Sequence, residues 1–406
     1  MSGSFRDWFF DFRRHPWPRI RLLREGTRMR GMYAARTVLR RCLPATCLAL
    51  GLIAPTTAGA FEFKGFGDIT YSSRTADDQT GSNNGFSIGQ LDLYATEQVD
   101  DRTDLLMELV IEGDQEGHFV SDLERLQVTY RFNNTHRLRA GRFHSLLGYW
   151  NRAYHHGAHL QTTTSRPYFL EFEDAGGVLP THAVGLWWSG RWNGNSGKLE
   201  TGVMVHNGAS IRYDSGTNPF TGILDAGTGG DTDNPKTVAA MIAFQPRGIK
   251  GLEVGLSGQI GTVVISDENS GGIATKTEVD QRITALHLAW PGEQTELIAE
   301  AFIWDHDAAG VTSGATAWFV QAGGRVGGSM LYMRYETLDA DRDTYFDSLG
   351  FTGAFGTGTA RQHTVGTFGL RFDLHYSSAL KIEFGQVDDD ADGTYDTATA
   401  QWSFSF

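Results

Sequence analysis

Apolar and polar residues alternate along most of the chain after residue 60. Between residues 125 and 132, for example, Leu126, Val128 and Tyr130 are separated by polar or charged neighbours. Because successive side chains of a β-strand point to opposite faces, this pattern predicts a strand with one apolar and one polar face. Comparable segments lie at residues 61–72, 90–95, 104–112, 252–259, 368–374 and 380–384. The pattern predicts an all-β protein.

The final six residues repeat this alternation and end the chain on an aromatic residue. Trp402, Phe404 and Phe406 would share one face, with Gln401 and two serines on the other. An apolar outer face and a polar inner face are typical of a transmembrane β-barrel, which has lipid outside and water inside. A soluble sandwich would have a similar apolar face, but here charges occupy the other face in strand after strand. We therefore predict a membrane-spanning barrel.

The predicted connections alternate between short turns and long loops. Short turns rich in Asn, Gly, Pro and Ser lie at residues 100–102, 133–135, 193–197, 247–250, 291–293, 325–328 and 375–378. Longer loops lie between them, at residues 73–85, 113–121, 145–181, 207–236, 264–278, 306–314, 339–361 and 388–393. Fifteen connections predict about sixteen antiparallel strands, an even number with both termini on the short-turn side, as in outer-membrane barrels.

The N-terminal residues have the order of a secretory signal peptide. Three arginines precede the apolar segment Leu43–Ile53, which is followed by the small residues Ala58, Gly59 and Ala60. This order predicts cleavage after Ala60. Residues 1–60 are thus interpreted as an N-terminal extension plus a signal peptide, with Met29 or Met32 as alternative start sites, and residues 61–406 as one barrel domain.

Cleavage would change the composition of the chain. Residues 1–60 hold 11 basic and three acidic residues, so their removal takes the net charge from −13 to −21. Both cysteines, Cys42 and Cys47, are lost, which excludes disulfides and thiolate metal sites from the remainder. Its 45 glycines in 346 residues are about twice the usual share of ~7%. The negative charge argues against a nucleic-acid partner.

Two short motifs and the strand layout resemble known families. The terminal Phe406 is similar to the C-terminal signature that marks Gram-negative outer-membrane proteins for the barrel assembly machinery, and residues 139–144 (RAGRFH) resemble a strand of several porins, including the phosphate-selective group. The layout resembles the sixteen-stranded porins. That resemblance implies an outer-membrane location among lipid and lipopolysaccharide, a homotrimer, and a third loop, residues 145–181, that folds inward as the constriction.

The third loop and its flanks contain most of the candidate selectivity residues, because pores select solutes by rings of charge and by constriction size. The candidates are Arg142, His144, Arg152, His155, His156, His159, Arg166, Glu171, Glu173 and Asp174. Facing acids and bases would create a transverse field, as the porin resemblance implies; alternatively, they pair with one another to hold the loop to the wall. Further basic residues could line the wall: Arg125, Arg131, Arg334 and Arg371.

His155, His156 and His159 form the motif H-H-x-x-H, in which a helical turn would place His155 and His159 on one face. Imidazoles suit zinc or copper, but hydrogen-bonded or pore-lining histidines are an alternative, and the metal assignment is left open. No cofactor is expected, although the acidic runs at residues 339–343 and 388–392 could hold a weakly bound divalent cation.

The sequence favours a porin for passive diffusion of small hydrophilic solutes or ions, without enzymatic activity. A phosphate-like, anion-selective channel is an alternative, but lysine is scarce and the net charge negative. A barrel enzyme or a barrel that encloses a partner protein are alternatives of another class. The sequence contains no G-x-S-x-G nucleophile motif, which argues against a hydrolase of that type.

Overall fold

The computed structural model describes residues 62–75, 84–113, 118–173, 177–214, 218–227, 230, 235–269, 272–350, 361–390 and 393–406. The predicted signal peptide and its cleavage site lie outside these residues. Within them, no helix is long and apolar enough to cross a membrane.

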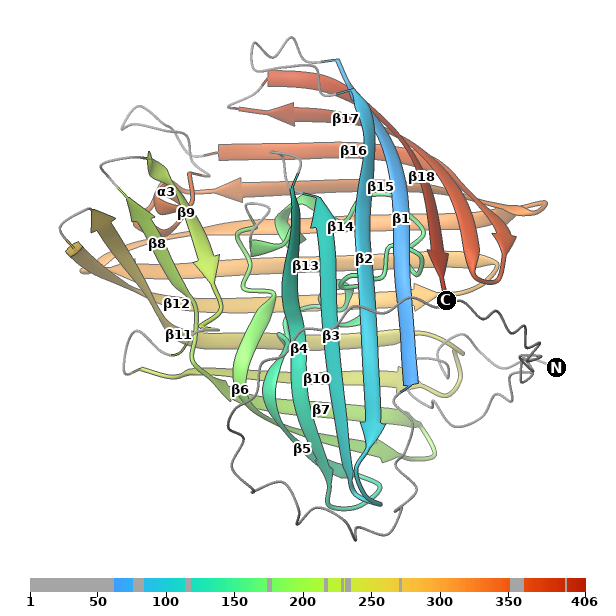
Figure 1. Ribbon diagram of the computed structural model, residues 1–406, viewed down its shortest axis with the longest axis horizontal. Helices are drawn as coiled ribbons and strands as arrows, with labels where there is room; N and C mark the ends of the chain where they lie inside the picture. Colours follow the sequence, from blue (N-terminus) through green and yellow to red (C-terminus); the bar gives the residue numbers. More distant parts are fainter. Residues whose placement is uncertain are drawn as a thin grey trace, which may run out of the picture. The chain divides into compact units, whose positions relative to one another are not determined.

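The described residues form one large antiparallel sheet (Figure 1). Its first strands are β1 (Glu62–Arg74), β2 (Gly85–Gln98), β3 (Thr103–Gly113), β4 (Phe119–Arg131), β5 (His136–His144), β6 (His182–Asn193) and β7 (Gly197–His206). The order continues with β10 (Thr237–Pro246), β11 (Glu253–Asn269), β12 (Gly272–Pro291), β13 (Thr295–Ala308), β14 (Val311–Val326), β15 (Ser329–Ala340), β16 (Arg361–His375), β17 (Ser378–Asp389) and β18 (Gly393–Ser405).

These sixteen strands close into a ring, which confirms the predicted strand number. The ring is closed by β1, which pairs with both β2 and β18. In the β1–β18 pair, Phe66 lies opposite Ser405 and Arg74 opposite Thr397. The strand β7 pairs directly with β10, so the intervening segment lies outside the ring order. A closed ring has no free strand edge, which is a requirement for a sheet in lipid.

Side-chain exposure follows the predicted alternation. Trp402 is 53% exposed, whereas Gln401 and Ser403 on either side of it are 5% and 0% exposed. In β4, Leu126 and Val128 are likewise exposed, at 53% and 44%. The exposed face of each strand is therefore the apolar one, as expected for a barrel with lipid outside.

Three of the predicted long loops differ from the structure. Residues 264–278 are mostly strand, because β11 continues to Asn269 and β12 begins at Gly272; the β-branched run 262–265 favours this extension. Residues 207–236 contain a hairpin of β8 (Ser210–Asp214) and β9 (Asn218–Asp225), in which β8 runs parallel to β11. Residues 306–314 reduce to a tight turn between β13 and β14. The predicted short turns are confirmed.

The segment between β5 and β6, residues 145–181, packs on the inner face of the ring. It contains the short helices α2 (Trp150–Ala153) and η1 (Tyr168–Leu170), while α3 (Thr344–Ser348) lies between β15 and β16. The ring centroid of Trp150 lies 5.7 Å from that of Phe319, and Phe169 lies 5.4 Å from Phe302. The inner face of β13 and β14 is thus partly apolar where this segment covers it, and not polar throughout as the alternation predicted.

The start of α2 is fixed by one acidic side chain of β13. The Glu300 carboxylate accepts hydrogen bonds from the backbone N–H groups of Tyr149 and Trp150, both at 2.7 Å. These are N–H groups that a helix start leaves without partners inside the helix. Gly148 has φ 72, and a Cβ at this position would collide with the Glu300 carboxylate. Only glycine therefore permits this approach.

We predict that Glu300→Gln lowers the free energy of unfolding by about 1.5–3 kcal/mol, because an amide cannot accept hydrogen bonds with both of its ends. The measurement is urea unfolding of the refolded chain in detergent, followed by tryptophan fluorescence. Glu293→Gln, in the exposed turn between β12 and β13, is the matched control and should change the value by less than about 0.5 kcal/mol. Equal values for both variants would contradict this anchoring role.

Candidate functional site

The middle of the 145–181 segment is bound to β17. The Glu383 carboxylate accepts hydrogen bonds from the backbone N–H of Thr164 at 3.0 Å and from the Ser165 hydroxyl at 2.7 Å. Lys381, which is fully buried, donates to the carbonyl oxygens of Thr163 and Ala158. Together with the Glu300 contacts on β13, these bonds attach the segment to two well-separated parts of the wall.

Two of the predicted wall arginines also bind this segment. Arg334 on β15 donates to the carbonyl oxygen of Ser165 at 2.9 Å and pairs with Glu336 at 3.2 Å. Arg371 on β16 donates to the carbonyl oxygens of His159 and Gln161, both at 2.8 Å. Both guanidinium groups therefore hold the loop backbone.

The other predicted wall arginines pair with carboxylates of neighbouring strands. Arg125 forms an ion pair with Glu108 of β3. Arg131, close to the turn between β4 and β5, lies 3.1 Å from Asp104.

The predicted loop cations contact the wall or an aromatic ring. Arg152 lies 3.0 Å from the Glu253 carboxylate of β11. Arg142, at the end of β5, donates to the backbone carbonyl of Glu124 at 3.0 Å. The guanidinium of Arg166 lies 3.6 Å from the ring centroid of Phe172.

Of the predicted acidic residues, Glu173 lies close to the end of the loop. Glu173 accepts hydrogen bonds from the Thr181 backbone at 2.7 Å and lies 2.9 Å from His182 Nδ1. Glu171 directly follows η1 and is partly buried, and Asp174 lies outside the described residues. Burial raises the pKa of Glu173, but the charge of His182 and the hydrogen bonds outweigh it and hold the pKa at about 2.

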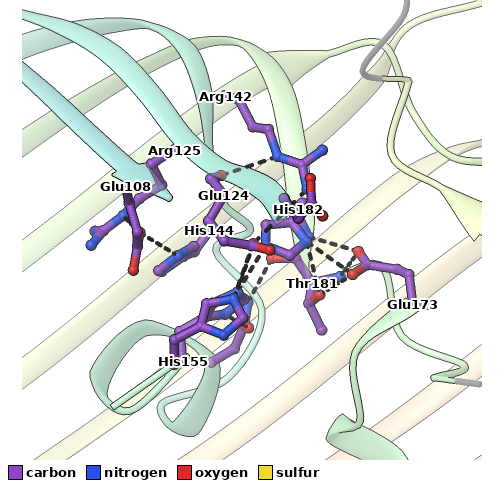
Figure 2. Close-up of polar contacts among 12 residues, drawn as sticks. Glu108, Glu124, Arg125, Arg142, His144, His155, Glu173, Thr181 and His182 are labelled. Carbon is purple, nitrogen blue, oxygen red and sulfur yellow. Dashed lines mark hydrogen bonds and ion pairs between the residues drawn. The ribbon is translucent and has the colours of Figure 1, made fainter. Parts of the chain in front are cut away.

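Two of the three motif histidines meet in a buried cluster, and the third does not. His155 and His156 converge with Glu124 of β4 and His182 of β6, with one candidate ligand atom of each residue within 4.8 Å of the others (Figure 2 shows part of the cluster). His159 instead lies beside β16–β18, with its Nε2 3.3 Å from the Tyr376 carbonyl oxygen. The four clustered residues are all at most 6% exposed.

A β-bulge makes Glu124 part of this cluster. In the pairing of β3 with β4, Glu108 lies opposite Arg125 and Leu109 opposite Leu123, so Glu124 is the extra residue. Bulges re-aim side chains in this way. His182 starts β6 directly opposite His144 at the end of β5, so it lies at the other end of the loop from His155. The pairing of β4, β5 and β6 thus brings the cluster together.

Each imidazole of the cluster has an acceptor at its Nδ1. His155 Nδ1 lies 2.7 Å from Asn151 Oδ1, and His156 Nδ1 lies 3.0 Å from Gln90 Oε1. His182 Nδ1 faces the Glu173 carboxylate. In the neutral imidazole these contacts place the proton on Nδ1, so Nε2 carries a lone pair. The Nε2 atoms face the Glu124 carboxylate, at 3.1 Å for His156 and 3.7 Å for His155, while His182 Nε2 forms an ion pair with it.

Aromatic rings enclose the cluster. The His144 ring stacks on the His155 ring with centroids 3.5 Å apart, and the Phe172 ring stacks on His156 at 4.2 Å. His144 Nε2 also lies 3.5 Å from the Glu108 carboxylate. His144 is therefore a packing neighbour of the cluster.

Sequence reasoning missed Glu124 and His182, which are distant along the chain from the histidine motif. One signal was present in the sequence: His144 and His182 flank the predicted loop, and its flanking strands were predicted to pair. The bulge at Glu124 is not apparent from the order of apolar and polar residues in β4, so the sequence did not indicate the bulge.

A second group of basic residues occupies the inner face of β4–β6, nearer the short turns. Arg131 lies directly opposite Arg137 of β5, and Arg139 is two residues further along the same face. Arg191 of β6 lies on this face as well, because it is two residues from Ser189, which pairs with Arg137. The prediction included Arg131 alone, although the spacing of Arg137 and Arg139 already places them on one face.

These arginines outnumber their acidic partners. Arg191 lies 2.9 Å from Glu200, and Arg131 has its pair on β3. Arg139 donates to the Ser189 hydroxyl at 2.9 Å and lies 3.9 Å from the Trp187 ring centroid. Among the described residues, no carboxylate forms an ion pair with Arg137 or Arg139. This stretch of the inner wall therefore carries excess positive charge, despite the negative net charge of the chain.

Solved structures of outer-membrane channels resemble this arrangement. An anion-selective porin from Comamonas acidovorans matches with a TM-score of 0.57 at 14% identity, over 86% of this chain and 100% of that one. The chain has the porin fold. The outer-membrane channel DcaP of Acinetobacter baumannii matches with a TM-score of 0.53 at 12% identity, over 87% and 99%. The trimer form of OmpT, an outer-membrane protein of Vibrio cholerae, gives 0.53 at 11%, over 86% and 100%.

No protein-family model matches the sequence, and no curated protein matches it. At these identities the structural likeness establishes the fold, and the activity has to be argued from the site itself.

The surroundings of His159 predict a dependence of stability on pH. Burial, and then the charges of Arg371 and Lys381, lower the pKa of His159 to about 4 from its ordinary value of about 6.5. Because the unfolded chain binds this proton more readily, the stability from the neutral imidazole is complete above about pH 6.5 and is lost as the pH falls to 4.

We therefore expect His159→Gln to lose less stability than the wild type between pH 6.5 and 4, by up to about 3 kcal/mol. The measurement is urea unfolding in detergent at both pH values. His375→Gln, at the exposed end of β16, serves as the control and should behave as the wild type. An identical pH dependence for His159→Gln and wild type would contradict the prediction.

Proposed function

We propose that the chain is an outer-membrane porin, through which small hydrophilic solutes or ions diffuse passively. The observation that carries this proposal is the closed ring of sixteen strands with an exposed apolar face and charged side chains on the inner face. At about 16 strands a barrel is too wide for the side chains of its own wall to fill the interior. The likeness to a porin and to an outer-membrane channel supports the same function.

The residues 145–181 are proposed as the constriction of this channel. They take up part of the interior and are attached to two parts of the wall, four strands apart, through Glu300 of β13 and Glu383 of β17. A segment attached in this way would narrow the passage without moving with each solute. Its cation Arg166 and the residues Arg142 and His144 at the end of β5 are the proposed selectivity residues of this level.

A preference for anions is the second candidate, and the excess of arginine on β4–β6 favours it. Arg137 and Arg139 add positive charge to the inner face where Glu200 and Asp104 balance only two of four arginines. Rings of charge of one sign select ions of the opposite sign. The likeness to an anion-selective porin supports this candidate as well.

Assembly and location are part of the proposal. The terminal Phe406 is 63% exposed, and its backbone exchanges two hydrogen bonds with Gly65 of β1. This exposed ring is available to the barrel assembly machinery before closure, and to membrane lipid and lipopolysaccharide afterwards. A homotrimer is proposed on the likeness to the trimer form of OmpT. Cross-linking of the detergent-solubilised protein tests this assembly.

The decisive experiment is conductance of the refolded chain in a planar lipid bilayer. Discrete ion-conducting steps support the porin. A silent barrel that cleaves lipid or peptide would support an enzyme instead, and a silent barrel without activity would favour a barrel that encloses a partner protein.

We predict that the double variant Arg137→Gln/Arg139→Gln shifts the reversal potential in a potassium chloride gradient towards cations, because it removes two positive charges from the wall. Single-channel conductance should persist, since the side chains remain similar in size. Arg247→Gln, in the exposed turn between β10 and β11, is the control and should leave the reversal potential unchanged. An unchanged value in the double variant would exclude anion selection by this group.

At the level of the loop, Arg142→Ala or Arg166→Ala should also shift the reversal potential towards cations. Arg142 lies 3.7 Å from the Asp122 carboxylate, so its removal leaves an acidic group without this neighbour. Arg152→Ala provides a comparison of the reversal potential within the same loop, because the charge of Arg152 is already paired with the buried Glu253. If neither Arg142→Ala nor Arg166→Ala shifts the potential, the loop charges do not select ions.

A further inference from the structure

We propose that Glu124, His155, His156 and His182 bind one divalent transition-metal ion of the zinc type. The candidate ligand atoms are the three Nε2 atoms and one carboxylate oxygen, and all lie within 4.8 Å of one another. This site is separate from the proposed channel function, and its metal would join the 145–181 segment to β4 and β6.

The distances between the ligand atoms fit a four-coordinate ion. Bonds of about 2.0–2.1 Å in tetrahedral geometry place neighbouring ligand atoms about 3.3 Å apart. His155 Nε2 lies 2.8 Å from His182 Nε2, and His156 Nε2 lies 3.1 Å from the Glu124 carboxylate. His155 Nε2 lies 3.7 Å from the same carboxylate oxygen. His182 Nε2 and the Glu124 carboxylate form an ion pair and would have to move apart to admit the ion between them.

The Nε2 atoms of all three histidines converge on the Glu124 carboxylate, because each Nδ1 is directed outward to its own acceptor. His182 Nε2 forms an ion pair with this carboxylate, and a metal ion would take the place of the proton between them. Among the described residues, His156 Nε2 has no well-aligned hydrogen bond, although it lies 3.1 Å from the Glu124 carboxylate and its side chain is only 4% exposed. A buried polar atom without a hydrogen bond is costly, and a metal ion bound to His156 Nε2 would remove this cost.

The surrounding residues have the arrangement that metal-binding histidines require. Histidine ligands usually donate their second N–H to a carboxylate or carbonyl oxygen, which fixes the ring orientation. Here Glu173 takes this role for His182, at 2.9 Å, and Asn151 takes it for His155, at 2.7 Å. Gln90 of β2 takes it for His156.

The charge and the ligand types identify the class of ion. Glu124 and Glu173 carry two negative charges, which balance a divalent cation. Glu108 has Arg125 as its partner. Arg142, 3.9 Å from Glu124, also lies 3.7 Å from Asp122. Three imidazoles and one carboxylate suit zinc, copper or nickel, whereas calcium and magnesium prefer oxygen ligands only. The ligands come from both ends of the loop and from two strands, so a bound ion would fasten the base of the loop to the wall.

The test is metal binding by the untagged, refolded chain in detergent, after chelator treatment. We expect one zinc ion per chain by elemental analysis after dialysis, and a cobalt derivative with the visible absorption bands of a four-coordinate site. Zinc should also raise the unfolding temperature, because binding to the folded chain stabilises it.

The variants His156→Gln and Glu124→Gln should each weaken zinc binding at least tenfold and abolish the cobalt bands. His375→Gln, at the exposed end of β16, is the matched histidine control and should bind as the wild type. Heat-dependent migration on gels checks that each variant forms the barrel. The cobalt spectrum of the wild-type chain is measured as well, so the proposal can still be tested if a variant fails to fold.

Three results would overturn the proposal: a wild-type chain that retains no zinc after dialysis, a cobalt spectrum of a six-coordinate ion only, or equal binding by the wild type and both cluster variants. Conductance does not enter these measurements. A barrel that conducts ions but binds no zinc would refute the metal site and leave the channel proposal standing. A barrel that binds zinc but conducts no ions would refute the channel and leave the metal site standing.

Discussion

A strand that crosses lipid can satisfy its backbone N–H and C=O groups only through neighbouring strands. The whole arrangement depends on this constraint, because it requires the pairing of β1 with β18 that closes the ring. The number of strands in the closed ring in turn sets the width of the interior. Closure also fixes which face of each strand is apolar, so charges such as Lys381 and Glu383 have to lie inside.

A ring of this width leaves an interior that the wall cannot fill, and the segment between β5 and β6 occupies part of it. Apolar residues such as Trp150 and Phe169 pack against aromatic side chains of β13 and β14. Buried charges of the wall bind the segment's backbone, which provides the partners that such charges need. The same contacts therefore stabilise the wall charges and hold the proposed constriction in position.

The histidine cluster joins these two parts of the structure. It needs the bulge at Glu124, the pairing of His144 with His182 at the ends of the loop, and the turn after α2 that carries His155. The arginines of β4–β6 lie on the same strands, nearer the short turns. One wall of the barrel thus combines the proposed metal site with the proposed anion-selecting charges.

The sequence alone determined the all-β class, the sixteen strands and the outward face of residues such as Trp402, because alternation with a period of two is local and lipid demands one apolar face in every strand. It also indicated the loop 145–181 and the positions of the short turns. It did not determine that β11 and β12 form a long hairpin, since the polar residues near their tips resemble a loop.

Only the tertiary structure decided what the loop contacts. Tyr149 meets Glu300 across 151 positions of sequence, and His155 meets Glu124 through the pairing of three strands. Such contacts depend on the curvature of the closed ring and on a bulge in β4, and neither is encoded in the order of apolar and polar residues. The physical reason is that alternation specifies a side chain's face, whereas its partners across the interior depend on how the whole ring closes.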